Sequence, residues 1–204
     1  MKIYILRHED RTMDCSFFSP LTKKGLENAI SLISLLKEKK IGAIYSSPFI
    51  RTLQTVYPYS ETNNIPINLE YSLSEFQHDE IIPKRSYCVR LPEYIAKDFN
   101  YNKNYHSEFE PENFNYPEKI DDVKRRVKNF ISNLIRTYHT IEDMHILIVT
   151  HQLPCNIISE LSHKHSSDSS EKEYTIDTNY PIGGLSKIFD GNSWIFSPIN
   201  WDYK

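Results

Sequence analysis

The hydrophobic positions of this chain fall into short continuous runs separated by polar stretches. The runs 3–6 and 146–149 are typical of strands that are buried on both faces of a sheet. Weaker runs at 41–45 and 65–73 predict two more strands. Near the carboxyl end, two short apolar segments flank residues 190–192, whose sequence Asp-Gly-Asn predicts the turn of a β-hairpin.

The segment between the runs 3–6 and 41–45 predicts a helix over residues 22–40. Thr22 is a suitable N-cap residue, and basic residues at the other end suit the helix dipole. We expect the apolar stripe of this helix to face the sheet. Its members are spaced at helical intervals: Leu26, Ala29, Ile30, Ile33 and Leu36.

Three further helices are predicted from capping residues and periodicity. Ser47 is placed as an N-cap, with Pro48 in the first helical position. Asp121 is expected to cap a helix that runs to about residue 138, and Pro154 to begin the last helix. Strands that alternate with helices indicate an α/β fold of three layers, helix-sheet-helix. Its sheet should be mainly parallel with an antiparallel C-terminal edge.

The chain is expected to form a single domain, residues 1–204, with a variable insertion at about 76–118. A length of 204 residues suits one domain with a sizeable core. The insertion mixes charges, aromatic residues and prolines without a clear period. We expect it to cover the functional site and to determine substrate choice, since loops commonly carry specificity.

Composition excludes several classes of partner. The net charge of −3 argues against a nucleic-acid binder driven by overall charge. No apolar run approaches the length of a membrane span. We expect no secretion leader, because the N-terminal residues predict a strand and not a basic segment followed by an apolar one. Cys15, Cys88 and Cys155 lack CxxC spacing, which disfavours a disulfide framework and a cysteine zinc site. These features favour a cytoplasmic protein in a reducing compartment.

Basic residues and histidines gather where the two strongest strands end. Arg7 and His8 follow the first strand, Arg11 comes shortly after, and His151 follows the strand at 146–149. Arg51 lies in the first turn of a predicted helix, a position that already favours anions. The carboxyl ends of parallel strands meet at one edge of a sheet, where α/β proteins bind ligands. We therefore interpret His8 as a nucleophile and the arginines as ligands of a phosphoryl group.

Glu75 is the candidate acid of this site. It follows the predicted third strand, so its carboxyl group could protonate a leaving-group oxygen. An isolated glutamate in a loop is more often simply solvated, and the residue type alone does not distinguish the two.

These segments together resemble the histidine phosphatase superfamily, which includes phosphoglycerate mutases and histidine acid phosphatases. The resemblance covers most of the chain and depends on the order and spacing of short motifs. The motifs are 6–8 (Leu-Arg-His), 20–25 (Pro-Leu-Thr-Lys-Lys-Gly), 45–55 (from Tyr45 to Thr55), 73–76 (Leu-Ser-Glu-Phe), 149–151 (Val-Thr-His) and 190–194 (Asp-Gly-Asn-Ser-Trp).

The resemblance implies a role for each candidate residue. His8 would become a transient phosphohistidine. Arg7, Arg51 and His151 would hold the phosphoryl oxygens, while Glu75 would protonate the leaving oxygen and later activate water. The resemblance implies no metal ion and no other cofactor, because the cations of the site are side chains.

The run from Arg7 to Arg11 is similar to the Arg-His-x-x-Arg version found in the tyrosine-phosphatase branch related to suppressors of T-cell-receptor signalling. That similarity implies that Arg11 also binds phosphate. The chain departs from the common pattern at Glu9 and Gln152, where the superfamily usually has small residues.

Three hypotheses follow. The first is a metal-independent phosphatase that hydrolyses phosphomonoesters, either phosphorylated small molecules or phosphoproteins. The second is a phosphoglycerate mutase-type phosphotransferase, which would need priming by a bisphosphate and would release little phosphate. The third is a non-catalytic phosphate-binding pseudoenzyme, motivated by Glu9 and Gln152. Trapping a phosphohistidine would separate the third from the other two.

Overall fold

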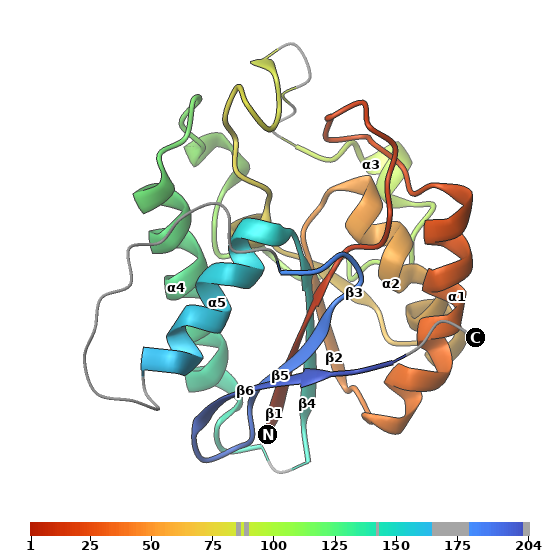
Figure 1. The fold of residues 1–204 in the computed structure, drawn as a ribbon, viewed down its shortest axis with the longest axis vertical. Helices are drawn as coiled ribbons and strands as arrows, with labels where there is room; N and C mark the ends of the chain where they lie inside the picture. The colour runs from red at the N-terminus through yellow and green to blue at the C-terminus, as the bar shows by residue number, and fades with distance from the viewer. Residues whose placement is uncertain (85–86, 88–89, 142, 165–179, 202–204) are drawn as a thin grey trace.

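A six-stranded sheet in the order β3-β2-β4-β1-β5-β6 forms the centre of the molecule (Figure 1). The computed structural model describes residues 1–84, 87, 90–141, 143–164 and 180–201. The first four strands along the chain pair in parallel, and the last two are antiparallel, as predicted. The strands are β1 (Lys2–Arg7), β2 (Ala43–Ser46), β3 (Ile67–Leu69), β4 (His145–Thr150), β5 (Leu185–Phe189) and β6 (Trp194–Ile199).

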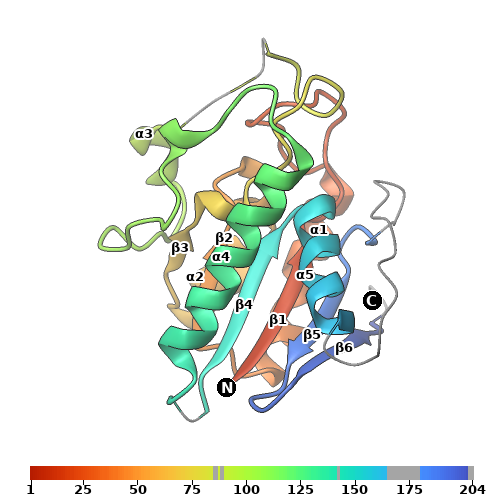
Figure 2. The ribbon, with the colours of Figure 1, turned by 90° about the vertical axis from the view of Figure 1, so that its left-hand side faces the viewer.

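Helices cover both faces of this sheet, which confirms the predicted three-layer α/β fold (Figure 2). Alternate residues of β1 enter different cores. Ile3 and Ile5 pack with α4 and α5, whereas Tyr4 and Leu6 pack with α1 and α2. The helices are α1 (Lys23–Glu38), α2 (Ile50–Asn63), the short α3 (Glu93–Ala96), α4 (Ile120–Tyr138) and α5 (Gln152–Lys164). None of the helices in the described part of the chain is long and apolar enough to span a membrane.

The buried face of α1 differs from the predicted stripe. The Thr22 N-cap is confirmed, because its side chain accepts from the backbone N–H of Gly25 at 3.1 Å. Leu26 and Ile30, however, are 43% and 59% exposed. A Cβ at Gly25 would lie 2.1 Å from the carbonyl oxygen of Asp10, so the helix approaches the end of β1 through its glycine. This approach turns another set of residues inward: Gly25, Asn28, Ala29, Leu32 and Leu36.

The predicted cap of α2 is wrong. This helix begins at Ile50, and its N-cap residue, Phe49, makes no side-chain cap hydrogen bond. The hydroxyl of Ser47 bonds instead to the ring of His151, so a tertiary contact replaces the local one.

Other boundaries also shift. Asp121 lies inside the first turn of α4 rather than capping it, where its charge still suits the helix dipole. The last helix, α5, begins at Gln152, before Pro154. The predicted strand at 65–73 is shortened to β3 and followed by a 3₁₀ helix over Tyr71–Leu73.

Within the segment 76–118, residues 100–102 lie along the outer edge of β3, and the chain then continues to α4 (Figure 2). Ile67 exchanges backbone hydrogen bonds with Asn100 and Asn102 at 2.7 and 2.8 Å. The buried carboxylate of Glu70 accepts hydrogen bonds from Tyr105 and other residues of this segment. The middle of the insertion is therefore fastened to the sheet just upstream of Glu75. Cys15 and Cys155 are free thiols, and Cys88 lies outside the described residues.

Candidate active site

The two strand-end histidines lie next to each other because β1 and β4 are adjacent and in register. Arg7 is opposite Thr150, so His8 and His151 both follow directly at the same sheet edge. The backbone N–H of His8 donates to the carbonyl of Thr150 at 3.0 Å, and the ring centroids are 5.3 Å apart. Both rings are buried. The structure thus brings together two residues that are 143 positions apart in the sequence.

The ring of His8 is held in one tautomer. Its Nδ1 lies 2.8 Å from the backbone carbonyl oxygen of Glu9, which can only accept a hydrogen bond. Nδ1 therefore carries the proton, and Nε2 keeps its lone pair. Burial, together with the positive charge of Arg51, lowers the pKa of His8 well below its usual value. At neutral pH the side chain is therefore a neutral imidazole.

Arg51 extends into the site from the first turn of α2, as the sequence predicted. Its Nη1 donates to the backbone carbonyl of Ser16 at 2.9 Å, and its guanidinium lies 4.6 Å from the centroid of the Phe49 ring. Burial lowers the pKa of Arg51 to about 10, while Glu75 opposes the shift. The side chain therefore remains charged at neutral pH. Its Nε has no hydrogen-bond partner among the described residues.

Arg7 and Arg11 add two further guanidinium groups. Arg7 Nη1 donates to the backbone carbonyl of Tyr180 at 2.5 Å, whereas its buried Nε lacks a partner in the described part of the chain. Arg11 donates to the carbonyl of Thr12 at 2.7 Å and lies about 4 Å from the thiol of Cys15. Buried donors left unpaired in a positive environment are suited to receive the oxygens of an anion.

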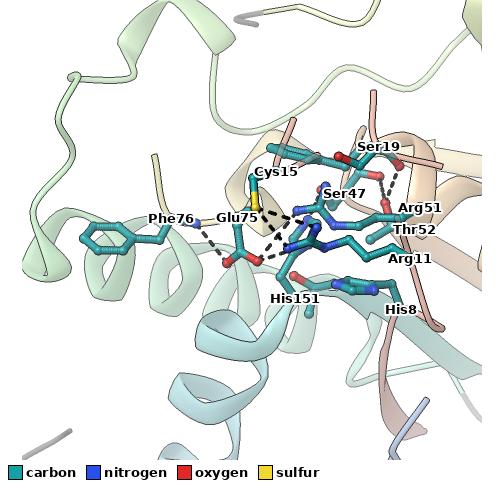
Figure 3. A network of polar contacts seen from close by, with 12 residues as sticks. His8, Arg11, Cys15, Ser19, Ser47, Arg51, Thr52, Glu75, Phe76 and His151 are labelled. Atoms are coloured by element: carbon teal, nitrogen blue, oxygen red, sulfur yellow. Dashed lines mark hydrogen bonds and ion pairs between the residues drawn. The ribbon is translucent and has the colours of Figure 1, made fainter. Parts of the chain in front are cut away.

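The carboxylate of Glu75 faces the side chains of Arg51 and His151 (Figure 3). One carboxylate oxygen, Oε1, accepts from the backbone N–H of Phe76 at 3.1 Å. The other, Oε2, lies 3.5 Å from His151 Nδ1 and 3.7 Å from Arg51 Nη2. The carboxyl group is thus placed beside the histidines, as its predicted role requires, although it follows a 3₁₀ helix rather than a strand.

His151 is fixed by a residue whose contribution the sequence did not reveal. The hydroxyl of Ser47 lies 2.8 Å from its Nε2. Burial, then the charge of Arg51, lowers the pKa of His151 well below its usual value. Ser47 follows β2 as His8 follows β1, and this equivalent position at a parallel strand end was the signal available in the sequence.

Arg126 and Glu118 were also missed. They form a buried ion pair on the α4 side of Glu75, with Arg126 Nε 2.8 Å from Glu118 Oε1. Arg126 lies on the inner face of α4 beside Val123 and Val127. A charged residue on an otherwise apolar helix face was the sequence signal for a buried role.

Glu9 and Gln152, the two residues that depart from the family pattern, follow the strand-end histidines His8 and His151 directly. Glu9 is buried, and its carboxylate accepts from the side-chain amide of Asn28 on α1 at 3.0 Å. Its backbone N–H donates to Thr55. The negative charge therefore points toward α1. Gln152 is the first residue of α5 and is partly exposed.

Three potential metal ligands occur in this cluster. One ligand atom each from His8, Glu75 and His151 lies within 4.8 Å of the others. The charges of Arg7, Arg11 and Arg51 all act on this group, as the lowered pKa of His8 reflects. Three guanidinium groups beside a single carboxylate favour an anion over a divalent cation.

Fold and site together define an α/β protein that gathers two histidines, a carboxylate and three arginines at the carboxyl ends of its parallel strands. The family model described as "Histidine phosphatase superfamily (branch 1)" matches residues 6–173. The chain therefore belongs to the histidine phosphatase superfamily. No curated protein sequence matches it.

Solved structures with the same fold cover nearly the whole chain. The ecdysone phosphate phosphatase from Bombix mori, in complex with tungstate, is similar with a TM-score of 0.76 and 13% identity, over 98% of this chain and 92% of that chain. The protein YhfR from Bacillus stearothermophilus has a TM-score of 0.63 and 20% identity, over 97% of this chain and 94% of that chain. The alpha-ribazole phosphatase from Shigella flexneri has a TM-score of 0.60 and 21% identity, over 98% of this chain and 95% of that chain.

Proposed function

We propose that this protein is a metal-independent phosphatase that hydrolyses phosphomonoesters through a phosphohistidine intermediate. The observation that carries the proposal is the state of His8: a buried, neutral ring whose Nδ1 is bonded to a carbonyl and whose Nε2 lone pair is free. Such a ring needs no proton removed before it attacks phosphorus.

The reaction has two balanced steps. In the first, His8 Nε2 forms a bond to phosphorus, the ester P–O bond breaks, and Glu75 gives its proton to the leaving oxygen. In the second, water attacks the phosphohistidine, Glu75 takes a proton from that water, and phosphate leaves as the P–N bond breaks. Covalent catalysis thus divides one displacement into two easier ones.

The arginines supply the electrostatic part of the catalysis. Phosphoryl transfer requires mainly positioning and stabilisation of charge on the phosphoryl oxygens. In the proposal Arg7, Arg11 and Arg51 hold these oxygens with N–H groups, and His151 contributes a further hydrogen bond. The place of Arg11 beside the cluster supports its assignment to the phosphate site, in line with the Arg-His-x-x-Arg motif of the suppressor-related branch.

We propose a phosphorylated small molecule as the substrate. One of the similar structures is described as an ecdysone phosphate phosphatase in complex with tungstate, which is an oxyanion, and another as an alpha-ribazole phosphatase. The segment 76–118 would determine which molecule is accepted, since it connects Glu75 to α4. A phosphoprotein remains the alternative substrate class.

The test is hydrolysis of 4-nitrophenyl phosphate in the presence of EDTA. The wild type is expected to release nitrophenol and phosphate in equal amounts, and His8→Ala neither. The matched control is His139→Ala, at an exposed position at the end of α4, which should retain activity. A chelator-sensitive rate, or undiminished turnover by His8→Ala, would contradict the mechanism.

Alkaline quenching, which preserves phosphohistidine, separates the remaining hypotheses. A phosphoenzyme that forms from an added bisphosphate and transfers its phosphoryl group to a monophosphate acceptor, with little release of phosphate, would indicate a mutase. Binding of vanadate without any phosphoenzyme would indicate a pseudoenzyme.

A further inference from the structure

A buried ion pair lies outside the proposed catalytic cluster and contacts the main chain of its acid. Arg126 comes from α4, and Glu118 lies just before that helix. Their side chains are only 1% and 2% exposed. The contact is bidentate, with Nε 2.8 Å from Oε1 and Nη2 3.0 Å from Oε2.

The pair bonds to the chain on both sides of Glu75. Arg126 Nη1 donates to the carbonyl of Ser72 at 2.6 Å, and Nη2 to the carbonyl of Glu75 itself at 3.2 Å. On the other side, Glu118 Oε2 accepts from the backbone N–H of Gln77 at 3.1 Å. The backbone N–H of Glu118 donates to the carbonyl of Gln77 at 2.7 Å.

This segment has no regular structure to hold it. Residues 74–77 belong to neither a helix nor a strand. The carboxylate of Glu75 is oriented by its own main chain, because Oε1 accepts from Phe76 N–H. A displacement of the backbone would therefore move the carboxyl group as well, and catalytic groups tolerate little displacement.

Stability alone is a weak reason for such a pair. Two charges removed from water regain their desolvation cost only with good geometry, and apolar replacements are often as stable. Arg126 uses its other N–H groups on carbonyls of the segment that carries Glu75. A buried guanidinium used in this way fixes one conformation of a chain that its local sequence leaves undetermined.

We infer that Arg126, held by Glu118, is a positioning residue for Glu75 as the proton donor. The inference rests on the proposed function. It implies that loss of the ion pair between Arg126 and Glu118 slows only reactions that need a proton on the leaving oxygen. A leaving group whose conjugate acid is strong, such as 2,4-dinitrophenolate, departs without being protonated. Unsubstituted phenolate and alkoxides are poorer leaving groups and need the proton from Glu75.

The experiment compares kcat/KM for 2,4-dinitrophenyl phosphate and phenyl phosphate. In Arg126→Lys, which keeps the charge but not the planar fork, the value for phenyl phosphate should fall roughly 10-fold or more beyond any fall for the dinitrophenyl ester. The vanadate inhibition constant should be unchanged. Glu118→Gln, a milder change, should show the same selectivity to a smaller degree. The matched control is Arg125→Lys on the same helix, where Arg125 pairs with Asp122 at the surface.

A second readout does not depend on turnover. Amide hydrogen exchange at Gln77 should accelerate in Arg126→Lys relative to amides of β4, with near-UV circular dichroism confirming the fold. Equal losses on both esters, or unchanged exchange at Gln77, would overturn the inference. If the wild type hydrolyses neither ester, the proposed function fails, and Gln77 exchange alone then decides whether the pair holds this segment.

Discussion

Acid should destabilise this protein through His8 and His151, the two buried histidines of the candidate site. The pKa values of His8 and His151 are lowered well below the ordinary value, chiefly by burial and then by Arg51. Between these lowered values and the unfolded pKa of about 6.5, the unfolded chain binds protons that the folded chain does not. The free energy of unfolding therefore falls as the pH decreases through that window.

The size of the effect follows from linkage. One histidine that stays neutral in the folded state lowers the free energy of unfolding by up to about 1.4 kcal/mol between pH 8 and pH 5.5. Two such histidines lower it by up to about 2.8 kcal/mol. Since maximal stability of a domain is only about 5–15 kcal/mol, such a loss is measurable.

Urea unfolding at pH 8, 6.5 and 5.5 in a phosphate-free buffer provides the assay. Wild type is compared with His8→Asn and with His151→Asn, and His139→Asn supplies an exposed substitution control. Each variant at the site should lose less stability between pH 8 and 5.5 than the wild type does, by about 1 kcal/mol or slightly more. Parallel pH dependences for the wild type and both variants would refute the account of buried, neutral rings.

Two further substitutions test the geometry around the site. Arg11→Ala should raise the vanadate inhibition constant roughly 10- to 100-fold, as expected for loss of a charge-assisted hydrogen bond, and an unchanged constant in a competition assay would remove Arg11 from the phosphate site. Gly25→Ala should destabilise by about 1–3 kcal/mol, because the new methyl group would meet the carbonyl oxygen of Asp10 at 2.1 Å. Gly42→Ala is its control, since there the close contact is the flexible Met144 side chain. Equal unfolding free energies for the two glycine variants would show that α1 can move away from Asp10.

The layers of the fold and most of the charged groups of the site can be predicted from the amino-acid sequence alone. Continuous apolar runs on β1 and β4 predict buried parallel strands, because each face must be covered by helices. Residues at the ends of such strands share one edge of the sheet, so the strand pattern is sufficient to group Arg7, His8 and His151.

How these groups are held depends on tertiary packing. The inward face of α1 depends on a backbone contact between Gly25 and Asp10, which hydrophobic periodicity does not encode. The hydroxyl of Ser47 could cap a helix or bond to His151, and both partners suit it equally in isolation. Arg126 and Glu118 reach Glu75 across more than 40 positions of the chain, through an insertion without a repeating pattern. The local sequence determines which kinds of hydrogen bond or ion pair a side chain can form. The packing of elements that are distant in the sequence determines which partner it bonds to.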